Sequence, residues 1–303
     1  MHFKSHANIP VFVPHMGCPH LCVFCDQKSI SGEKDELTPE KAQNQIEEAL
    51  STLQGRRAEI AFFGGSFTAI EREKMIAFLA LASSYLKSGR VSGIRLSTRP
   101  DCVDEEILDI LSFYGVSAVE LGVQSLDEEV LKASGRRHSV KDTADACARI
   151  KQRGCFLLGC QMMLGLPAST REKELLTARE ICRIGADCTR IYPTVVLKDT
   201  PLEALWKKGL YRPLSLEEGV LRGADCFEIF ENAGVKVLRM GLCAEESCRE
   251  QAVAGCYHPA YGELVYNRLY LQKLRRMLEE NPPAKGSLCR ILLPKGELSL
   301  AIG

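Results

Sequence analysis

Short β-rich runs alternate with longer segments of helical period along the first 200 residues of the chain. Six of these runs predict strands: IPVFVP at 9–14, EIAFFG at 59–64, IRLST at 94–98, AVELGV at 118–123, FLLGCQMMLGL at 156–166 and TRIYPTVV at 189–196. Capping residues mark helix starts: Thr38 before Pro39, Ser169 with Glu172, and Ser215 with Glu218. The alternation favours a parallel sheet with right-handed crossovers, so we predict an α/β fold, a partial TIM-type (β/α)6 barrel.

The regular alternation of predicted strands and helices ends at about residue 240. A helix at about 215–233 and the short strand VKVLRM precede a stretch with Cys and Gly over 241–262, and the helical segment GELVYNRLYLQKLRRMLEE follows. We therefore predict a core barrel domain over residues 1–240 and a small C-terminal α/β element over 241–303.

The charge balance and the hydrophobicity restrict the location and the partners of the chain. Its 39 basic and 39 acidic side chains cancel, so any RNA site must be a local patch. Nowhere do 18 apolar residues run together, and the N-terminus lacks a signal-peptide core. These features predict a cytoplasmic protein that does not associate with membranes.

The chain has 14 cysteines, which without a signal peptide indicate free thiols, metal sites or clusters rather than disulfides. Scattered cysteines among apolar residues predict small buried hydrophobes: Cys147, Cys155, Cys160, Cys182 and Cys226.

Three cysteines stand apart, because Cys18, Cys22 and Cys25 form a C-x3-C-x2-C loop directly after the first predicted strand. Three thiolates on one short loop can bind three irons of a 4Fe-4S cluster and leave the fourth iron open to another ligand. The alternative is a structural zinc site, which needs four protein ligands and would take its fourth from His15 or His20.

With Phe24 before its last cysteine, this loop resembles the signature of radical S-adenosylmethionine enzymes. The resemblance implies a 4Fe-4S cluster and S-adenosylmethionine as cofactors, and reductive cleavage of S-adenosylmethionine to a 5′-deoxyadenosyl radical. It also implies an electron donor such as flavodoxin or ferredoxin.

Candidate cofactor-binding residues follow the predicted strands. Gly64, Gly65 and Ser66 come after the second strand, where a glycine pair lets a ligand approach the backbone, although an isolated pair is more often a plain turn. They resemble the family motif that binds the methionine amino group of the cofactor. Glu120 and Gln124 share one face of the fourth strand, so they either contact a ligand or satisfy each other inside the barrel.

Further candidates lie where barrel enzymes place their sites, at the carboxyl ends of strands. Ser97 and Arg99 end the third strand, and Gly165 ends the fifth.

The segments GGSFTAI, STRPD, ELGVQS with SGRRHS, LGLP and IYPTVVLKDTPLEALWKKGLY, over residues 9–213, resemble the catalytic subunit of the Elongator complex. Oxygen-independent coproporphyrinogen oxidases share the triad, the glycine pair and GVQS followed by G-R-x-H. The Elongator resemblance implies Tyr192 and Lys198 as catalytic candidates, and His258 and Tyr261 in HPAYGELV are further candidate substrate contacts. About 100 residues follow IYPTVV, so we do not expect the Elongator acetyltransferase domain.

These observations leave three hypotheses about function. The first is a radical enzyme that modifies tRNA or another RNA, supported by local basic groups: Lys132, Arg136, Arg137, Lys273, Arg275 and Arg276. Such charges are usually solvated helix faces, which weakens this support. The second is a radical enzyme acting on a small molecule such as a tetrapyrrole, and the third is a non-catalytic, metal-stabilised RNA-binding module.

Two expectations concern the C-terminal element. Cys243, Cys248, Cys256 and His258 lack the short C-x2-C knuckle of common metal sites, so we predict neither an auxiliary cluster nor zinc there. The ending SLCRILLPKGELSLAIG resembles the helix that leads into the G-x-x-G loop of KH domains and predicts a truncated KH-like segment. The alternative is an ordinary C-terminal helix that docks on the barrel.

Overall fold

Seven parallel strands form one curled sheet with the order β1-β2-β3-β4-β5-β6-β8. The computed structural model describes residues 6–13, 16–18, 22–26, 37–53, 57–242 and 246–284, together with 286, 290 and 292. The strands are β1 His6–Val13, β2 Arg57–Gly64, β3 Gly93–Thr98, β4 Ala118–Gln124, β5 Leu157–Leu164, β6 Cys188–Pro193 and β8 Lys236–Met240. Strands β1 and β8 are the two edges, so the sheet is a half-barrel and the predicted fold class is confirmed.

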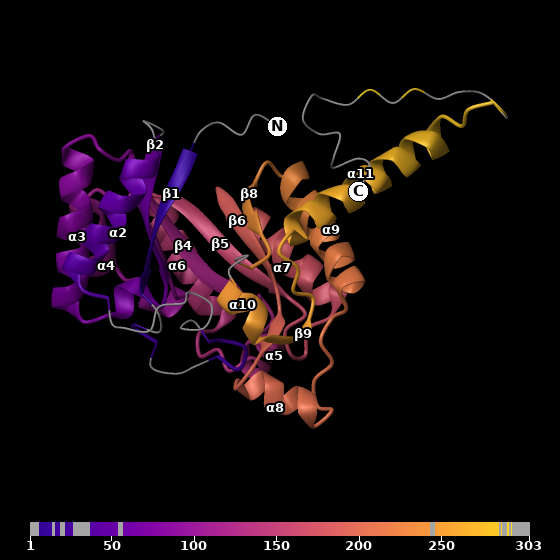
Figure 1. Cartoon of the computed structure of the whole chain (residues 1–303), viewed down its shortest axis with the longest axis horizontal. Helices are drawn as coiled ribbons and strands as arrows, with labels where there is room; N and C mark the ends of the chain where they lie inside the picture. The colour runs from indigo at the N-terminus through magenta and orange to yellow at the C-terminus, as the bar shows by residue number, and fades with distance from the viewer. Residues whose placement is uncertain are drawn as a thin grey trace.

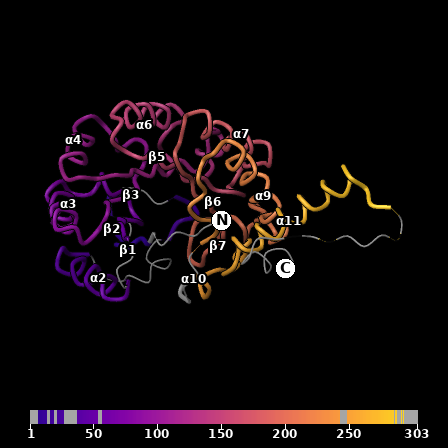
Figure 2. Tube along the Cα trace, turned by 90° about the horizontal axis from the view of Figure 1, so that it is seen from above, coloured from indigo at the N-terminus to yellow at the C-terminus, as the bar shows by residue number. Residues whose placement is uncertain are grey.

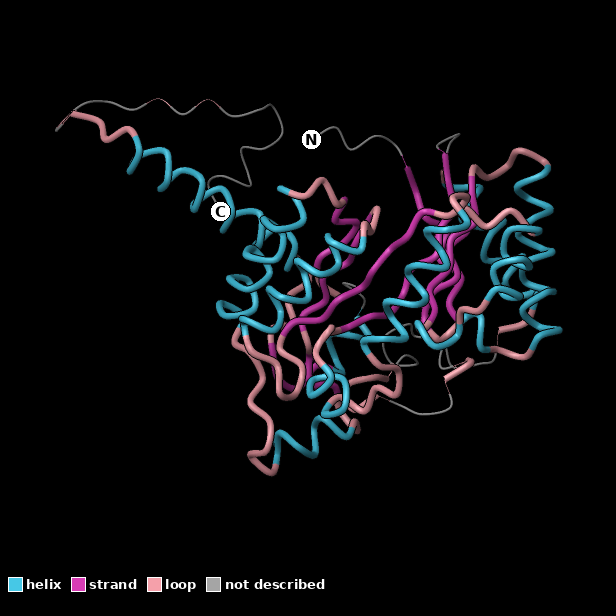
Figure 3. The backbone as a smooth tube through the Cα atoms, turned by 180° about the vertical axis from the view of Figure 1, so that it is seen from behind, coloured by secondary structure: helices cyan, strands magenta, loops and turns pink. Residues whose placement is uncertain are grey.

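Helices cover the outer, convex face of this sheet. Viewed from above, they follow one another in chain order around the arc (Figure 2): α2 Pro39–Thr52, α3 Arg72–Lys87, α4 Glu105–Phe113, α6 Val140–Arg153, α7 Arg171–Ile184 and α9 Leu216–Asn232. Helices flank the strands at both ends of the sheet when the molecule is seen from behind (Figure 3). Short elements sit in the connections: η1 Phe67–Ala69, η2 Pro100–Cys102, α5 Glu128–Ala133 and α8 Pro201–Lys207.

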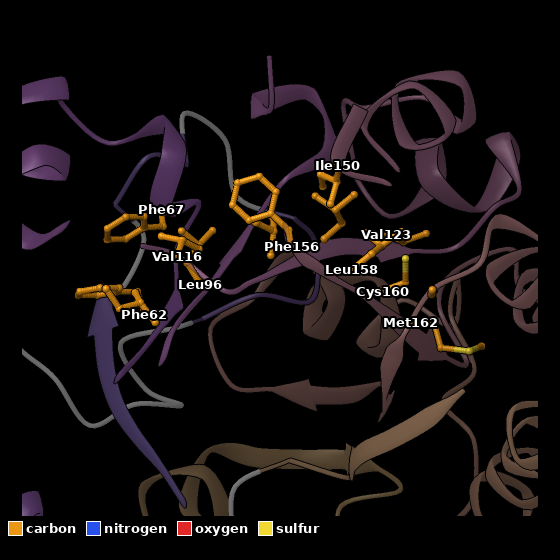
Figure 4. Close-up of a cluster of buried hydrophobic side chains, with 14 of the residues drawn as sticks. Phe62, Phe67, Leu96, Val116, Val123, Ile150, Phe156, Leu158, Cys160 and Met162 are labelled. Carbon is orange, nitrogen blue, oxygen red and sulfur yellow. The ribbon is translucent and has the colours of Figure 1, made fainter. Parts of the chain in front are cut away.

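The main hydrophobic core lies between the sheet and these helices. Phe62 and Phe67 stack with their ring centroids 4.5 Å apart, and the cluster continues through Leu96 and Leu158 to Ile150 of α6 (Figure 4). Because strand side chains alternate between faces, burying these residues outward leaves the intervening residues on the concave face. That face is therefore available for a site.

The strand predictions needed two corrections. The run TRIYPTVV is two strands, because Pro193 ends β6 and β7 (Val195–Leu197) pairs antiparallel with β9 (Ala252–Gly255) in a second sheet. Proline has no N–H to donate to a ladder, so it interrupts the run. The VKVLRM strand joins the barrel as β8, beside β6, and raises the strand count from six to seven.

Two of the three predicted caps are confirmed. Thr38 accepts a hydrogen bond from the backbone N–H of Lys41, and Ser215 forms a reciprocal capping box with Glu218. The third cap is Thr170 rather than Ser169, whose hydroxyl instead donates to Glu174.

The last described helix, α11 (Tyr261–Glu280), packs along α9 and extends beyond the body of the molecule (Figure 1). Tyr261, Val265 and Leu269 contribute to the same core as the barrel. Before it, α10 (Glu246–Gln251) leads into β9. In the described part of the chain, no helix has the length and apolar character needed to span a membrane.

Most predictions for the scattered thiols agree with their positions. Cys147, Cys160 and Cys226 are buried and Cys182 is half-buried, but Cys155 is exposed just after α6, so its predicted burial was wrong.

Candidate active site

A cavity of about 430 Å³ opens on the concave face of the half-barrel. Cys18, Cys22 and Cys25 all line it, together with residues at the carboxyl ends of β2, β3 and β4. Residues of β1, β5, β6, β7 and β8 contribute further parts of the wall. The fold thus brings the cysteine triad against the strand ends where the sequence placed the cofactor candidates.

The loop that carries Cys18 is seated directly on the glycine pair. Gly65 donates its N–H to the Val13 carbonyl at 2.8 Å, and Ser66 donates to the Met16 carbonyl at 2.9 Å. A Cβ at Gly65 would lie 2.1 Å from the Met16 carbonyl oxygen, and a Cβ at Gly17 would lie 2.3 Å from the Ser66 oxygen. The cysteine loop therefore approaches Gly65 closely from one side, and because Gly65 also lines the cavity, ligand binding there stays a prediction.

Ser66 lies beneath the cavity rather than in its wall. Its buried hydroxyl shares a hydrogen bond with Thr98 at 2.9 Å and accepts one from the Arg99 N–H at 3.1 Å. Ser66 therefore ties the glycine turn to the end of β3, and Arg99 in turn donates to the Gly17 carbonyl at 3.3 Å.

Burial and mutual repulsion act on the thiols of the triad. Burial raises the pKa of Cys18, which the nearby Arg99 partly counteracts. Burial also raises the pKa of Cys25, and the neighbouring Cys22 and Cys18 raise it further. Arg136 donates to Cys22 Sγ at 3.5 Å and supplies a positive charge beside the triad. Thiols in such surroundings give up their protons to a bound metal, whose charge replaces the proton.

The donor set of the triad suits an iron-sulfur cluster. A cubane cluster offers a separate iron to each of three thiolates. The three soft sulfur donors around one cavity suit that arrangement. His15 and His20, the proposed fourth zinc ligands, lie outside the described residues.

Glu120 does not line the cavity, and its partner is not Gln124. Its carboxylate, 1% exposed, accepts hydrogen bonds from Arg190 at 2.6 and 3.0 Å, from Arg95 at 3.0 Å and from Gln161 at 3.0 Å. Burial alone would raise the pKa of Glu120, but Arg190 and Arg95 hold it below its usual value. The carboxylate is therefore ionised, and both of its oxygens accept hydrogen bonds from side chains inside the barrel.

Gln124 lies in the wall and is strained. It has a φ of +65°, in the left-handed region, at an irregularity in the pairing of β4 with β5. Its Oε1 is buried and has no hydrogen-bond partner in the described part of the chain. Non-glycine residues in this conformation cluster at functional sites, and an unpaired buried oxygen is costly unless a ligand meets it.

Of the other candidates, Gly64, Ser97, Arg99 and Tyr192 also line the cavity. Gly165 does not, because its N–H donates to Glu174 and its carbonyl accepts from the Tyr211 hydroxyl at 2.6 Å. Lys198 is exposed beyond β7 and is absent from the lining.

The predicted contacts in HPAYGELV also lie away from the cavity. His258 Nδ1 accepts from the Ala260 N–H at 3.1 Å, just before α11. Tyr261 is buried, and its hydroxyl donates to the Gly219 carbonyl at 2.6 Å, so it belongs to the core and not to the substrate site.

Sequence reasoning found Arg99 but missed the other three arginines of the site. Arg136 was counted among the basic groups that support RNA binding, yet it lines the cavity together with Arg190 and Arg239. Alternation along β6 places Arg190 and Tyr192 on one face, which was the available signal. By contrast, Lys273 and Arg276 form exposed ion pairs with acidic residues of α9.

Some C-terminal predictions cannot be compared with the structure. Cys243 lies outside the described residues, whereas Cys248 and Cys256 are buried, and the absence of metal there stays a prediction. The KH-like segment at 287–303 also lies outside the described residues, apart from positions 290 and 292.

Comparisons with known families agree with this geometry. The profile of the radical SAM superfamily matches residues 12–181, and that of the radical SAM C-terminal domain matches residues 186–271. An uncharacterized protein of Methanocaldococcus jannaschii is 30% identical over 73% of this chain and 71% of its own length. The tRNA uridine(34) acetyltransferase of Dehalococcoides mccartyi is 28% identical over 68% of this chain and 52% of its own.

Solved structures also match this fold. Archaeal Elp3 of Methanocaldococcus infernus, with an N-terminal deletion, matches with a TM-score of 0.71 and 25% identity, over 90% of this chain and 64% of that one. Coproporphyrinogen III oxidase of Escherichia coli matches with a TM-score of 0.55 and 16% identity, over 76% of this chain and 53% of that one. Among the curated relatives, the chain spans about half the length of the tRNA uridine(34) acetyltransferase of Dehalococcoides mccartyi.

Proposed function

Because the chain belongs to the radical SAM superfamily, whose enzymes cleave S-adenosylmethionine reductively, we propose that it applies this chemistry to tRNA. The proposal assigns the 4Fe-4S cluster to Cys18, Cys22 and Cys25 and the cofactor to the cavity beside them. The observation that carries the assignment is that all three thiols line one cavity with Gly64, Arg99 and the strained Gln124.

The cluster, when bound, supplies the electron that cleaves the cofactor sulfonium and yields a 5′-deoxyadenosyl radical. The protein residues hold and orient the reactants. Seating the cysteine loop on Gly65 fixes Cys18 relative to the ends of β2 and β3, which Ser66 and Arg99 lock together. Such preorganisation lowers the entropic cost of bringing the reactants together.

Two wall residues suit the methionine end of the cofactor. Arg136 has no carboxylate within salt-bridge distance among the described residues, and it points one guanidinium nitrogen at Cys22. We assign it to the cofactor carboxylate, since guanidinium and carboxylate form charge-assisted hydrogen bonds. The unpaired Oε1 of Gln124 can accept a hydrogen bond from an ammonium or a hydroxyl group of the cofactor.

Glu120 has a positioning role in this proposal. By accepting from both Arg95 and Arg190, it fixes the Arg190 guanidinium 4.8 Å above the Phe63 ring in the cavity wall. A bound ligand therefore meets Arg190, Phe63 and Gln161 rather than Glu120.

Support for a tRNA substrate comes from the relatives. Two further archaeal tRNA uridine(34) acetyltransferases are 32% and 31% identical over 61% of this chain, and yeast Elongator complex protein 3 is 29% identical over 52%. The second candidate, a tetrapyrrole substrate, is supported by the likeness to coproporphyrinogen III oxidase, which is a likeness of fold.

The test compares substrates for the reduced, anaerobically reconstituted enzyme supplied with S-adenosylmethionine. We expect unmodified tRNA to increase 5′-deoxyadenosine formation and a nucleoside of that tRNA to change mass in a reaction that requires S-adenosylmethionine. Heparin serves as a control for polyanion binding and should have no effect. Stimulation by coproporphyrinogen III but not by tRNA would replace the tRNA proposal with the tetrapyrrole one.

A further inference from the structure

The lysine, arginine, aspartate and glutamate side chains that line the cavity in the described residues are all arginines, although Asp101 pairs with Arg99 and Glu120 pairs with Arg190. Four arginines line the cavity, Arg99, Arg136, Arg190 and Arg239, and no aspartate or glutamate does so among the described residues. The whole chain has equal numbers of acidic and basic side chains, so the preference for basic over acidic side chains is a property of this cavity and not of the whole chain. A cavity lined by one sign of charge concentrates ligands of the opposite sign.

The four arginines form two pairs with different surroundings. Arg99 donates to the Gly17 carbonyl and Arg136 to Cys22 Sγ, so the first pair contacts the cysteine loop. Arg190 and Arg239 are register partners on the adjacent strands β6 and β8. Like charges directly opposite each other on neighbouring strands are unfavourable unless a counter-charge lies between them.

The available counter-charge is incomplete. Arg190 shares Glu120 with Arg95, and Arg95 also pairs with Glu59 at 3.1 Å. With Arg239 included, the group has three guanidinium groups and two carboxylates. One positive charge in it is therefore not balanced by a carboxylate of the group. No carboxylate of the described residues lies within salt-bridge distance of Arg239.

Arg239 is also held in place. Its Nε donates to the Gly241 carbonyl at 3.2 Å and its Nη2 to the Leu242 carbonyl at 3.0 Å. Gly241 turns the chain with a φ of +86°, which brings both carbonyls within reach of the guanidinium. The remaining N–H donors meet no acceptor among the described residues, so they can contact a ligand, as a preorganised guanidinium does in oxyanion recognition.

From this geometry we propose that Arg239 and Arg190 form a subsite that binds one singly charged oxyanion of the substrate. The same chemistry is offered by a phosphodiester of RNA and by a carboxylate of a small organic acid. The inference rests on the proposed function only in taking this cavity as the site of the reaction, and it does not require that the substrate is tRNA.

The test uses equilibrium binding to the full, anaerobically reconstituted chain, which needs no turnover. One probe pair is the dinucleotide UpU and its uncharged methylphosphonate analogue, and the other is coproporphyrin III and its tetramethyl ester. We expect the chain to bind the charged member of at least one pair about tenfold more tightly than the neutral member. A preference within the UpU pair identifies a phosphodiester, and one within the porphyrin pair identifies a carboxylate.

Arg239→Gln should abolish that preference. Arg239→Lys should retain part of it, since lysine keeps the positive charge but lacks the planar set of N–H donors of the guanidinium. The matched control is Lys236→Gln, which removes one charge from the same strand at an exposed side chain outside the cavity and should leave the preference unchanged. Circular dichroism of each variant confirms its fold. A preference that survives in Arg239→Gln, or the lack of any preference in the unaltered chain, overturns the subsite. Formation of 5′-deoxyadenosine, measured separately, reports on the radical chemistry.

Discussion

At the scale of single residues, Gly65 decides whether the cysteine loop can lie where it does. We predict that Gly65→Ala destabilises the fold by about 1–3 kcal/mol and lowers the iron content of the reconstituted protein, because the new Cβ meets backbone oxygens that cannot swing away. The measurements are a urea unfolding curve and iron per chain.

Gly262→Ala is the matched control for this substitution. A Cβ at Gly262 would lie 3.4 Å from its nearest neighbour, an ordinary contact, and the site is in the first turn of α11. Equal iron content in the two variants would show that Gly65 does not seat the loop.

His138 gives the fold a dependence on pH. Burial and Arg136 lower its pKa to about 4, against the opposing effects of Asp101 and of a hydrogen bond to the Val123 carbonyl. Between pH 6.5 and about 4 the unfolded chain therefore binds a proton that the folded chain does not, so stability falls as the pH falls through this window. The expected loss from His138 is about 2 kcal/mol at pH 5 relative to pH 7.5.

His138→Gln should remove this part of the pH dependence. Urea midpoints of both proteins at pH 7.5 and pH 5 provide the comparison. If the unaltered protein and the variant lose the same stability between the two pH values, His138 does not carry the effect.

Motif residues could be located from the sequence, whereas their partners could not. Cys18, Gly65 and Arg99 belong to short motifs at strand ends, and topology alone places such ends together. Glu120 was assigned to a ligand because its real partners, Arg95 and Arg190, lie 25 and 70 residues away in the chain. Such pairing depends on the curvature of the sheet, which no local pattern encodes.

At the scale of elements, α9 depends on its cap. Ser215 accepts from the Glu218 N–H at 3.1 Å, and Glu218 accepts from the Ser215 N–H at 2.8 Å. We predict that Ser215→Ala lowers the free energy of unfolding by about 1 kcal/mol. The control is Ser84→Ala, at an exposed position inside α3, where alanine is a better helix former and should cost nothing. Equal urea midpoints for the two variants would contradict the role of the cap.

The periodicity of the sequence predicted where the six strand-forming segments lie, but not how the last of them is divided and paired. The break at Pro193 was readable in principle, since proline cannot donate to a ladder. The pairing of β7 with β9 was not, because it joins segments about 60 residues apart through a register that only the folded barrel sets.

At the scale of the whole molecule, the half-barrel separates two kinds of interior. Apolar side chains fill the space between the sheet and its helices, whereas the cavity on the concave face is lined by arginines and polar side chains as well as apolar ones. The sheet stays open between its edge strands β1 and β8, whereas a closed barrel fills its interior with side chains.

The most direct test of the account is the formation of 5′-deoxyadenosine by the reduced, reconstituted enzyme and its cysteine variants. We predict that the unaltered chain forms the nucleoside from S-adenosylmethionine and that Cys18→Ala, Cys22→Ala and Cys25→Ala each abolish it, because an iron then lacks its protein ligand. Cys155→Ala, at an exposed thiol away from the cavity, should retain full activity. Undiminished product from all three triad variants, or no product from an iron-loaded unaltered chain, would contradict the account.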